Sequence, residues 1–248
     1  SINWNGRTLY QIKACKTFIT NSAIEITEGE LGGWVEKEQN LSQEGLAWIE
    51  KDAKVYGTAK VYGDADVWGN AKIGGNAKIS DNAEIRGNAE IAGNAIIRGN
   101  AKIEENAYIY GKTEIYGNAE ILGNAKVSGY AKICGNAKVC GNAKIAGNAK
   151  VCGNAEIYGN AEIWDNAKIV KDATVCDNAL VYNNTKIWGN AEIAGNAIVC
   201  GNAEVCDNAS VYNNAEIRGS AKIYEEAIVW GNANVSDDAK ICGNAKVC

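Results

Sequence analysis

The stretch that decides the fold is residues 135–146, which reads GNAKVCGNAKIA. It contains two copies of a six-residue unit, Ala-x-Ile/Val-y-Gly-Asn, which repeats without insertion from Ala47 to the end of the chain. Every sixth residue from Ile49 to Val247 is Ile or Val, and the residue two places earlier is nearly always Ala. Because the repeat covers most of the chain, its period indicates the architecture more strongly than any single residue does.

Each unit predicts one short strand followed by one corner. Ala and Ile/Val are two residues apart, so both side chains lie on one face of a strand, while x and y lie on the other. Gly accepts the left-handed backbone region that a tight corner needs, and Asn tolerates it best among the other residues. Apolar spacings of two and four do not follow a helical period, and hairpins this short would leave their hydrogen bonds unpaired. The repeat therefore predicts stacked coils.

The unit, with Ile/Val followed four residues later by Ala, resembles the hexapeptide repeat of left-handed parallel β-helices. That fold occurs in bacterial acyltransferases and γ-class carbonic anhydrases, and its handedness departs from the usual rule for crossovers. The resemblance implies a single all-β domain, a triangular solenoid with about 18 residues per coil, formed by residues 47–248 after an N-terminal cap segment, 1–46. The cap followed by hexads is similar to uncharacterised bacterial and phage hexapeptide-repeat proteins, which implies no established activity.

The charges at position x favour three hexads per coil. When every third x residue is placed in one column, as three hexads per coil require, a mostly basic column separates from a mostly acidic one. The acidic column contains Asp66, Glu84, Glu120, Glu156 and Glu192, against the three lysines Lys102, Lys138 and Lys246. The basic column, with the aromatic residues at y beside it, is the candidate interaction face: Lys60, Lys78, Lys132, Lys150, Lys168, Lys186, Lys222, Lys240, Tyr62, Tyr116, Trp188 and Tyr224.

The N-terminal segment breaks the period and predicts an atypical cap, which solenoids need to cover the exposed core of a terminal coil. Residues 7–15 alternate and predict a strand, and residues 30–36 predict an irregular first coil. Residues 40–45 predict a loop that shifts the register by two before Ile49. The candidate cap core consists of Phe18, Trp34 and Leu41.

At the other end, the chain stops inside a hexad, at Lys246-Val247-Cys248. Three interpretations stay open: a further domain follows, the last coil frays, or the end stacks on another copy. An uncovered coil would present unpaired backbone groups.

All cysteines except Cys15 occupy position y, and only Cys134 and Cys152 are neighbours on adjacent coils of one column. Their Cα atoms would lie about 4.8 Å apart, within the disulfide range, although parallel Cβ vectors strain such a bond. The favoured interpretation is that y accepts a small apolar side chain, and the alternative is a thiol contact through these two residues. Zinc-ligand spacing is absent, so we predict no metal and no cofactor.

The absence of His excludes Ser-His-Asp and Cys-His catalysis and any His-ligated metal. The acyltransferases that the repeat resembles typically use a His base in a cleft between subunits, and γ-class carbonic anhydrases need three His ligands. We therefore expect no catalytic residue and no enzymatic activity, with an acyltransferase-like enzyme as a disfavoured alternative.

The outward aromatic and Cys residues predict more apolar surface than a monomer normally has. We predict a structural, assembly or binding module that self-associates as a homo-oligomer or filament, laterally or through its C-terminal end, with basic and acidic columns in contact. The alternative is binding of a polyanion or nucleic acid by the Lys and aromatic face, against which stand a net charge of −5 and a pI of about 5.0.

No apolar run approaches the roughly 18 residues of a membrane span, and no signal-peptide pattern opens the chain. We predict no membrane partner and a cytoplasmic or virion-associated protein.

Overall fold

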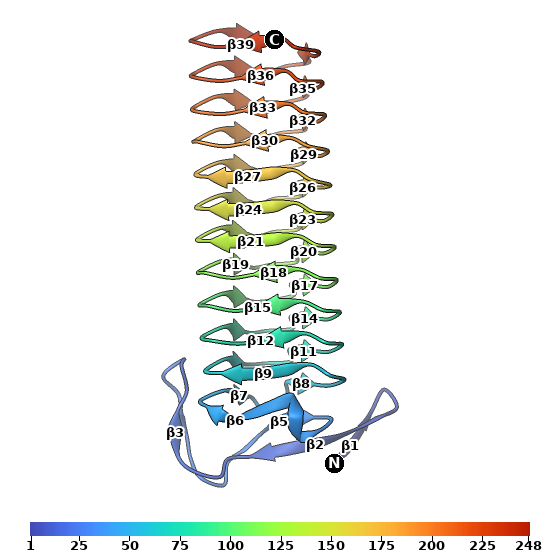
Figure 1. Cartoon of the computed structure of the whole chain (residues 1–248), viewed down its shortest axis with the longest axis vertical. Helices are drawn as coiled ribbons and strands as arrows, with labels where there is room; N and C mark the ends of the chain where they lie inside the picture. The colour runs from blue at the N-terminus through green and yellow to red at the C-terminus, as the bar shows by residue number, and fades with distance from the viewer. The chain divides into compact units, whose positions relative to one another are not determined.

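The structure is a computed structural model that describes residues 1–248 as two compact units, Ser1–Gly123 and Asn124–Cys248. Both units are all-β apart from one short 3-10 turn, η1 (Glu38–Asn40). Each strand of a coil pairs in parallel with the strand three places further along the chain, and paired residues are 18 apart, as in Lys78 and Lys60. Figure 1 shows this stacking for β9, β12 and β15 and for β21, β24 and β27. The fold is the predicted parallel β-solenoid.

The coil strands of the first unit are β7 (Trp48–Ile49), β8 (Lys54–Val55), β9 (Lys60–Gly63), β10 (Asp66–Val67), β11 (Lys72–Ile73), β12 (Lys78–Ile79), β13 (Glu84–Ile85), β14 (Glu90–Ile91), β15 (Ile96–Ile97), β16 (Lys102–Ile103), β17 (Tyr108–Ile109), β18 (Glu114–Ile115) and β19 (Glu120–Ile121).

The strands of the second unit are β20 (Lys126–Val127), β21 (Lys132–Gly135), β22 (Lys138–Val139), β23 (Lys144–Ile145), β24 (Lys150–Gly153), β25 (Glu156–Ile157), β26 (Glu162–Ile163), β27 (Lys168–Lys171), β28 (Thr174–Val175), β29 (Leu180–Val181), β30 (Lys186–Ile187), β31 (Glu192–Ile193), β32 (Ile198–Val199), β33 (Glu204–Val205), β34 (Ser210–Val211), β35 (Glu216–Ile217), β36 (Lys222–Ile223), β37 (Ile228–Val229), β38 (Asn234–Val235), β39 (Lys240–Ile241) and β40 (Lys246–Val247).

The core of each unit consists of the Ala and Ile/Val positions of the hexad. Ile85 and Ala89 in the first unit, and Ile145 and Ala149 in the second, are fully buried. Because equivalent hexad positions stack one coil apart, each Ile or Val packs on the Ile or Val of the next coil, as Ile145 does on Val127 and Ile163, and the small Ala lets the walls approach at each corner.

The corners use Gly and Asn for different reasons. The left-handed residue is the first of the pair, and Gly135 is typical, with φ +72. A Cβ there would lie 2.8 Å from the carbonyl oxygen of Gly153 in the next coil, so Gly also permits the close approach. The Asn that follows is not left-handed, contrary to our expectation. Its amide instead donates to the amide oxygen of the Asn one coil away, as Asn142 Nδ2 does to Asn160 Oδ1 at 3.0 Å.

Where an acidic residue takes the left-handed position, its side chain satisfies a backbone donor of the next coil. The carboxylate of Asp165 accepts from the N–H of Asn183 at 3.1 Å, and that of Asp177 from the N–H of Gly195 at 3.0 Å. This contact offsets the cost of the left-handed backbone in a non-Gly residue.

The N-terminal segment is formed by β1 (Ile2–Trp4), β2 (Arg7–Lys13), β3 (Phe18–Ile19), β4 (Glu25–Ile26), β5 (Leu31–Val35) and β6 (Leu41–Gly45). β1, β2 and β5 pair antiparallel, as do β3 and β4. β5 and β6 already pair in parallel with β8 and β9 of the first regular coil. The boundary between residues 46 and 47 stays a prediction.

The three candidate cap-core residues occupy different places. Phe18 is half-buried and packs edge-on against Trp48, with ring centroids 5.7 Å apart. Leu41 takes an inward position, in register with Val61. Trp34 is in register with Lys54, an outward position, and its neighbour Val35 is the residue that is buried. One-residue alternation thus decides which side chain of the strand faces the core.

Candidate functional site

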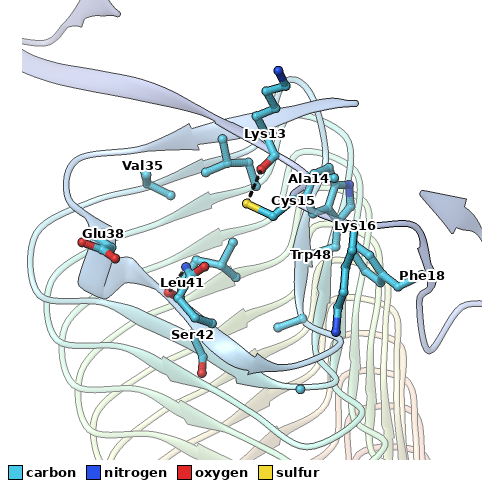
Figure 2. A pocket seen from close by; sticks show the side chains of 14 residues that line it. Lys13, Ala14, Cys15, Lys16, Phe18, Val35, Glu38, Leu41, Ser42 and Trp48 are labelled. Carbon is cyan, nitrogen blue, oxygen red and sulfur yellow. Dashed lines mark hydrogen bonds between the residues drawn. The ribbon is translucent and has the colours of Figure 1, made fainter. Parts of the chain in front are cut away.

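A pocket of about 390 Å³ lies in the N-terminal part of the first unit, and we refer to it as the base pocket. Figure 2 shows its lining from the end of β2, from η1 and from β6. Phe18, Val35, Leu41 and Trp48 make the apolar part of its wall. The polar lining residues include Lys13, Cys15, Lys16, Glu38 and Ser42.

Gly32 explains how the bulky indole of Trp48 fits at the base. A Cβ on Gly32 would lie 2.6 Å from Cζ2 of Trp48 and 2.8 Å from Cγ1 of Ile12, so only Gly leaves room for this ring. Because the lining comes from separated, non-periodic segments, the hexad pattern contained no signal for the base pocket.

The turn between β3 and β4 docks on the acidic column of the first unit. The N–H of Ser22 donates to Oδ2 of Asp66 at 2.9 Å, and Asn21 Nδ2 donates to the carbonyl of Asn82 at 3.3 Å. Asp66 is fully buried, and burial together with the nearby Glu84 raises the pKa of its carboxyl group. Glu84 is itself buried and paired with Arg86. This part of the acidic column is therefore covered and not available to a partner.

A second hollow, of about 480 Å³, lies beside β6 and contains the first residues of the predicted interaction face. We call it the β6 hollow. Its lining residues are Gln39, Leu41, Ser42, Lys60, Val61, Tyr62 and Lys78. Lys60 and Lys78 are exposed register neighbours on β9 and β12, and Tyr62 is 38% exposed.

Four predicted lysines form a row on adjacent strands of the second unit. This basic row consists of Lys132, Lys150, Lys168 and Lys186, on β21, β24, β27 and β30. All four are exposed, and Lys150 and Lys168 have no carboxylate within 4.0 Å. Like charges placed directly opposite each other in a sheet are unfavourable, so Lys150 and Lys168, in the middle of the row, carry uncompensated positive charge.

Glu204 ends the basic row. Its carboxylate oxygens lie 2.8 Å from Nζ of Lys186 and 3.0 Å from Nζ of Lys222, and these two partners lower the pKa of the Glu204 carboxyl group. Trp188 is 37% exposed at the side of the row, with Nζ of Lys171 5.8 Å from its ring centroid.

The remaining face residues are not grouped into one site. The guanidinium of Arg98 lies over Tyr116, 4.8 Å from its ring centroid, in the first unit. Tyr224 is half-buried and Lys240 exposed in the second unit. The structure therefore gathers part of the predicted face into two separate groups, the β6 hollow and the basic row, and the use of this face for interaction stays a prediction.

Cys134 and Cys152 form a disulfide between β21 and β24, with their Cα atoms 4.6 Å apart. The short in-register distance was expected, but the favoured interpretation, two small apolar side chains without a bond, was wrong, and the alternative had been a thiol contact. The other cysteines are free thiols. Burial and the neighbouring Asp207 raise the pKa of Cys206 to about 11, and burial raises that of Cys176, so both thiols stay protonated at neutral pH.

No helix of the structure has the length and apolarity that a membrane span requires. No protein-family model matches the chain, and neither does any curated protein. Among solved structures, the chain is similar to LpxA from Acinetobacter baumannii, with a TM-score of 0.25 and 16% identity over 81% of this chain and 69% of that chain. This likeness concerns the fold alone.

The finding corrects our expectation that the chain has no enzymatic activity. The parallel β-solenoid is a class of fold in which acyltransferases also occur, so the fold gives no ground for excluding an enzyme. The absence of His removes one kind of general base, but it does not separate the chain from that class. No reaction and no residue role is transferred at this level of identity.

Proposed function

We propose that the protein is a rigid β-helical scaffold that associates with further copies of itself through its flat sheet faces. The basic row of one copy would contact the acidic sheet of another. The observation that carries this proposal is the uncompensated charge of Lys150 and Lys168. The fully buried stack of Ala and Ile/Val supports rigidity, since each aliphatic side chain of the regular core lies between the Ile or Val side chains of the two adjoining coils.

The sheet that contains β25 and β31 offers the complementary surface within the second unit. Glu156 and Glu192 are exposed there, with only Thr174 between them in the column. Tyr158 beside them is 37% exposed, like Trp188 beside the basic row. Opposite charges steer association, and flat aromatic side chains add contact area. A contact between two different faces is heterologous, so it builds rings or filaments.

Light scattering at low and high ionic strength tests the proposal. We expect concentration-dependent oligomers at about 20 mM salt that dissociate at about 500 mM, where charges are screened beyond a few ångströms. The double variant Lys150→Glu with Lys168→Glu should be monomeric at both. The matched control, Lys126→Glu with Lys144→Glu, makes the same change of net charge on the third sheet, which the proposed contact does not use, and should still associate. A wild-type protein that stays monomeric at high concentration in both salts contradicts the proposal.

The same row supports a second candidate function, the binding of a polyanion such as nucleic acid. One lysine per coil gives a linear array of charges at the strand spacing of about 4.8 Å, with Trp188 available for stacking. We expect salt-sensitive retention of the wild type on a phosphate-bearing column. Replacing Lys132, Lys150, Lys168 and Lys186 by Glu should abolish it, and equal retention of this variant would exclude the second candidate.

A further inference from the structure

We propose that the β6 hollow is a binding site for a small organic phosphate, whose phosphate group lies between Lys60 and Lys78 and whose ring stacks on Tyr62. The site lies in the first unit and is independent of the lateral association proposed above, which uses the second. Its geometry follows from one irregularity in the repeat.

The irregularity is a bulge in β6. Leu41 is in register with Val61 and Gly45 with Gly63, so three residues of β6 lie opposite the single residue Tyr62 of β9. A regular hexad would place one residue there. Extra residues on one strand bend it and interrupt the ladder, and the hollow lies beside this interruption.

The charge of the hollow is positive and uncompensated. Lys60 and Lys78 are in register on adjacent strands, both exposed, and neither has a carboxylate within 4.0 Å. On another sheet of the same unit, by contrast, Lys72 forms an ion pair with Glu90 at 2.5 Å. Two adjacent ammonium groups repel each other, and an anion between them would remove this cost.

A phosphate monoester suits this pair better than a carboxylate. It carries a charge of about −1.5 to −2 at neutral pH, which matches two ammonium groups, and it has three strong acceptor oxygens. Lysine binds phosphate as a point charge, so two neighbouring ammonium groups can contact different oxygens of one phosphate without a fixed fork geometry.

Tyr62 gives the site its preference for a ring. It makes no ring or cation contact, in contrast to Tyr116, whose ring is covered by the guanidinium of Arg98 at 4.8 Å. An open aromatic face beside two cations stacks a flat ligand and leaves its anionic group at the ammonium groups.

The lining of the hollow also has polar groups for the rest of the ligand. The hydroxyl oxygen of Ser42 accepts from the N–H of Glu44 at 3.1 Å, so its own proton is free to be donated. The amide of Gln39 can both donate and accept. Together these groups fit a ring that carries hydroxyl substituents.

Calorimetric titration with phenyl phosphate tests the proposal on the full chain. Phenol probes the ring alone and inorganic phosphate the anion alone. We expect saturable one-to-one binding of phenyl phosphate, with both fragments about tenfold weaker or more. Lys60→Gln and Lys78→Gln should each reduce the affinity about tenfold or more, because each removes a charge-assisted contact. Tyr62→Leu should remove the advantage of phenyl phosphate over inorganic phosphate.

The matched controls are Lys150→Gln and Lys168→Gln, equally exposed lysines of the second unit that have no bulge beside them. Both should bind phenyl phosphate as the wild type does. Equal losses in these controls, or no saturable binding by the wild type up to about 10 mM, would overturn the proposal. Either result is independent of the light-scattering test, which does not involve Lys60 or Lys78.

Discussion

The N-terminal part of the first unit and the second unit use the same strand pairing but differ in regularity. In the second unit every pair of stacked strands keeps a register of 18 residues. At β6 the register is broken by a bulge, and both candidate cavities touch that strand at Leu41 and Ser42. The regular coils give flat faces with repeated charge, whereas the irregular coil gives concave surfaces. Four predictions test this contrast.

The largest effect is expected in the core of the regular coils. Ile145 is fully buried between Val127 and Ile163 of the adjoining coils, so Ile145→Ala should cost about 2–5 kcal/mol of unfolding free energy, through lost burial and a cavity. Leu41 is half-buried beside the bulge, so Leu41→Ala should cost less than half as much. Urea denaturation followed by circular dichroism measures both. Equal costs would mean that the bulged coil is packed as tightly as the regular ones.

The second prediction removes the bulge itself. Deleting Ser42 and Gln43 restores the six-residue spacing between Leu41 and the next aliphatic position, so β6 should pair regularly with β9. We expect the affinity for phenyl phosphate to fall about tenfold or more, with the strand content unchanged by circular dichroism. A deletion variant that binds as well as the wild type would show that the bulge does not shape the site.

The third prediction concerns the docked turn between β3 and β4. The pKa of the Asp66 carboxyl group is raised in the folded state. The stabilisation of the docked turn by protonated Asp66 is therefore fully present below the ordinary Asp pKa of about 3.9, and it is lost as the pH rises through the raised pKa of the folded state. Hydrogen-exchange protection of the Ser22 amide, relative to its intrinsic rate, should fall by at most about tenfold per pH unit across that interval.

The control for this measurement is Asp66→Asn, which keeps an oxygen to accept from the Ser22 N–H and has no charge. Its protection should not depend on pH in the same interval. A wild type whose protection rises with pH there would reverse the sign of the proposed linkage.

The smallest effect is expected from single lysines of the basic row. Lys150 has like charges on both register neighbours, so Lys150→Gln should raise stability by about 0.2–1 kcal/mol, more at low salt. Lys186 is paired with Glu204, so Lys186→Gln should lower it by a similar amount. Thermal unfolding at two salt concentrations distinguishes these opposite signs, and the same sign for both would contradict the charge assignment.

The regular part of the molecule was predictable because its contacts are periodic. A two-residue alternation inside a six-residue repeat assigns Ile145 and Ala149 to the core, and the lysine column gives the coil length that the strand register confirms. In such a solenoid each residue meets the residue 18 places away, so local sequence already contains the tertiary neighbours.

The cavities and the covered residues of the N-terminal segment depended on tertiary structure, because this segment has no repeat from which its contacts could be predicted. The sequence predicted a shift of two residues before Ile49, but not that it would form a bulge opposite Tyr62 and leave a hollow there. It likewise contained no sign that Ser22 would cover Asp66, 44 residues away, or that Trp48 would fill the space left by Gly32. By itself, the sequence determined the repeat, its core and the row of lysines. Only the packing of the irregular segment against the first coils decided which charged residues are covered and which lie beside a cavity, because these contacts join segments that no repeat relates.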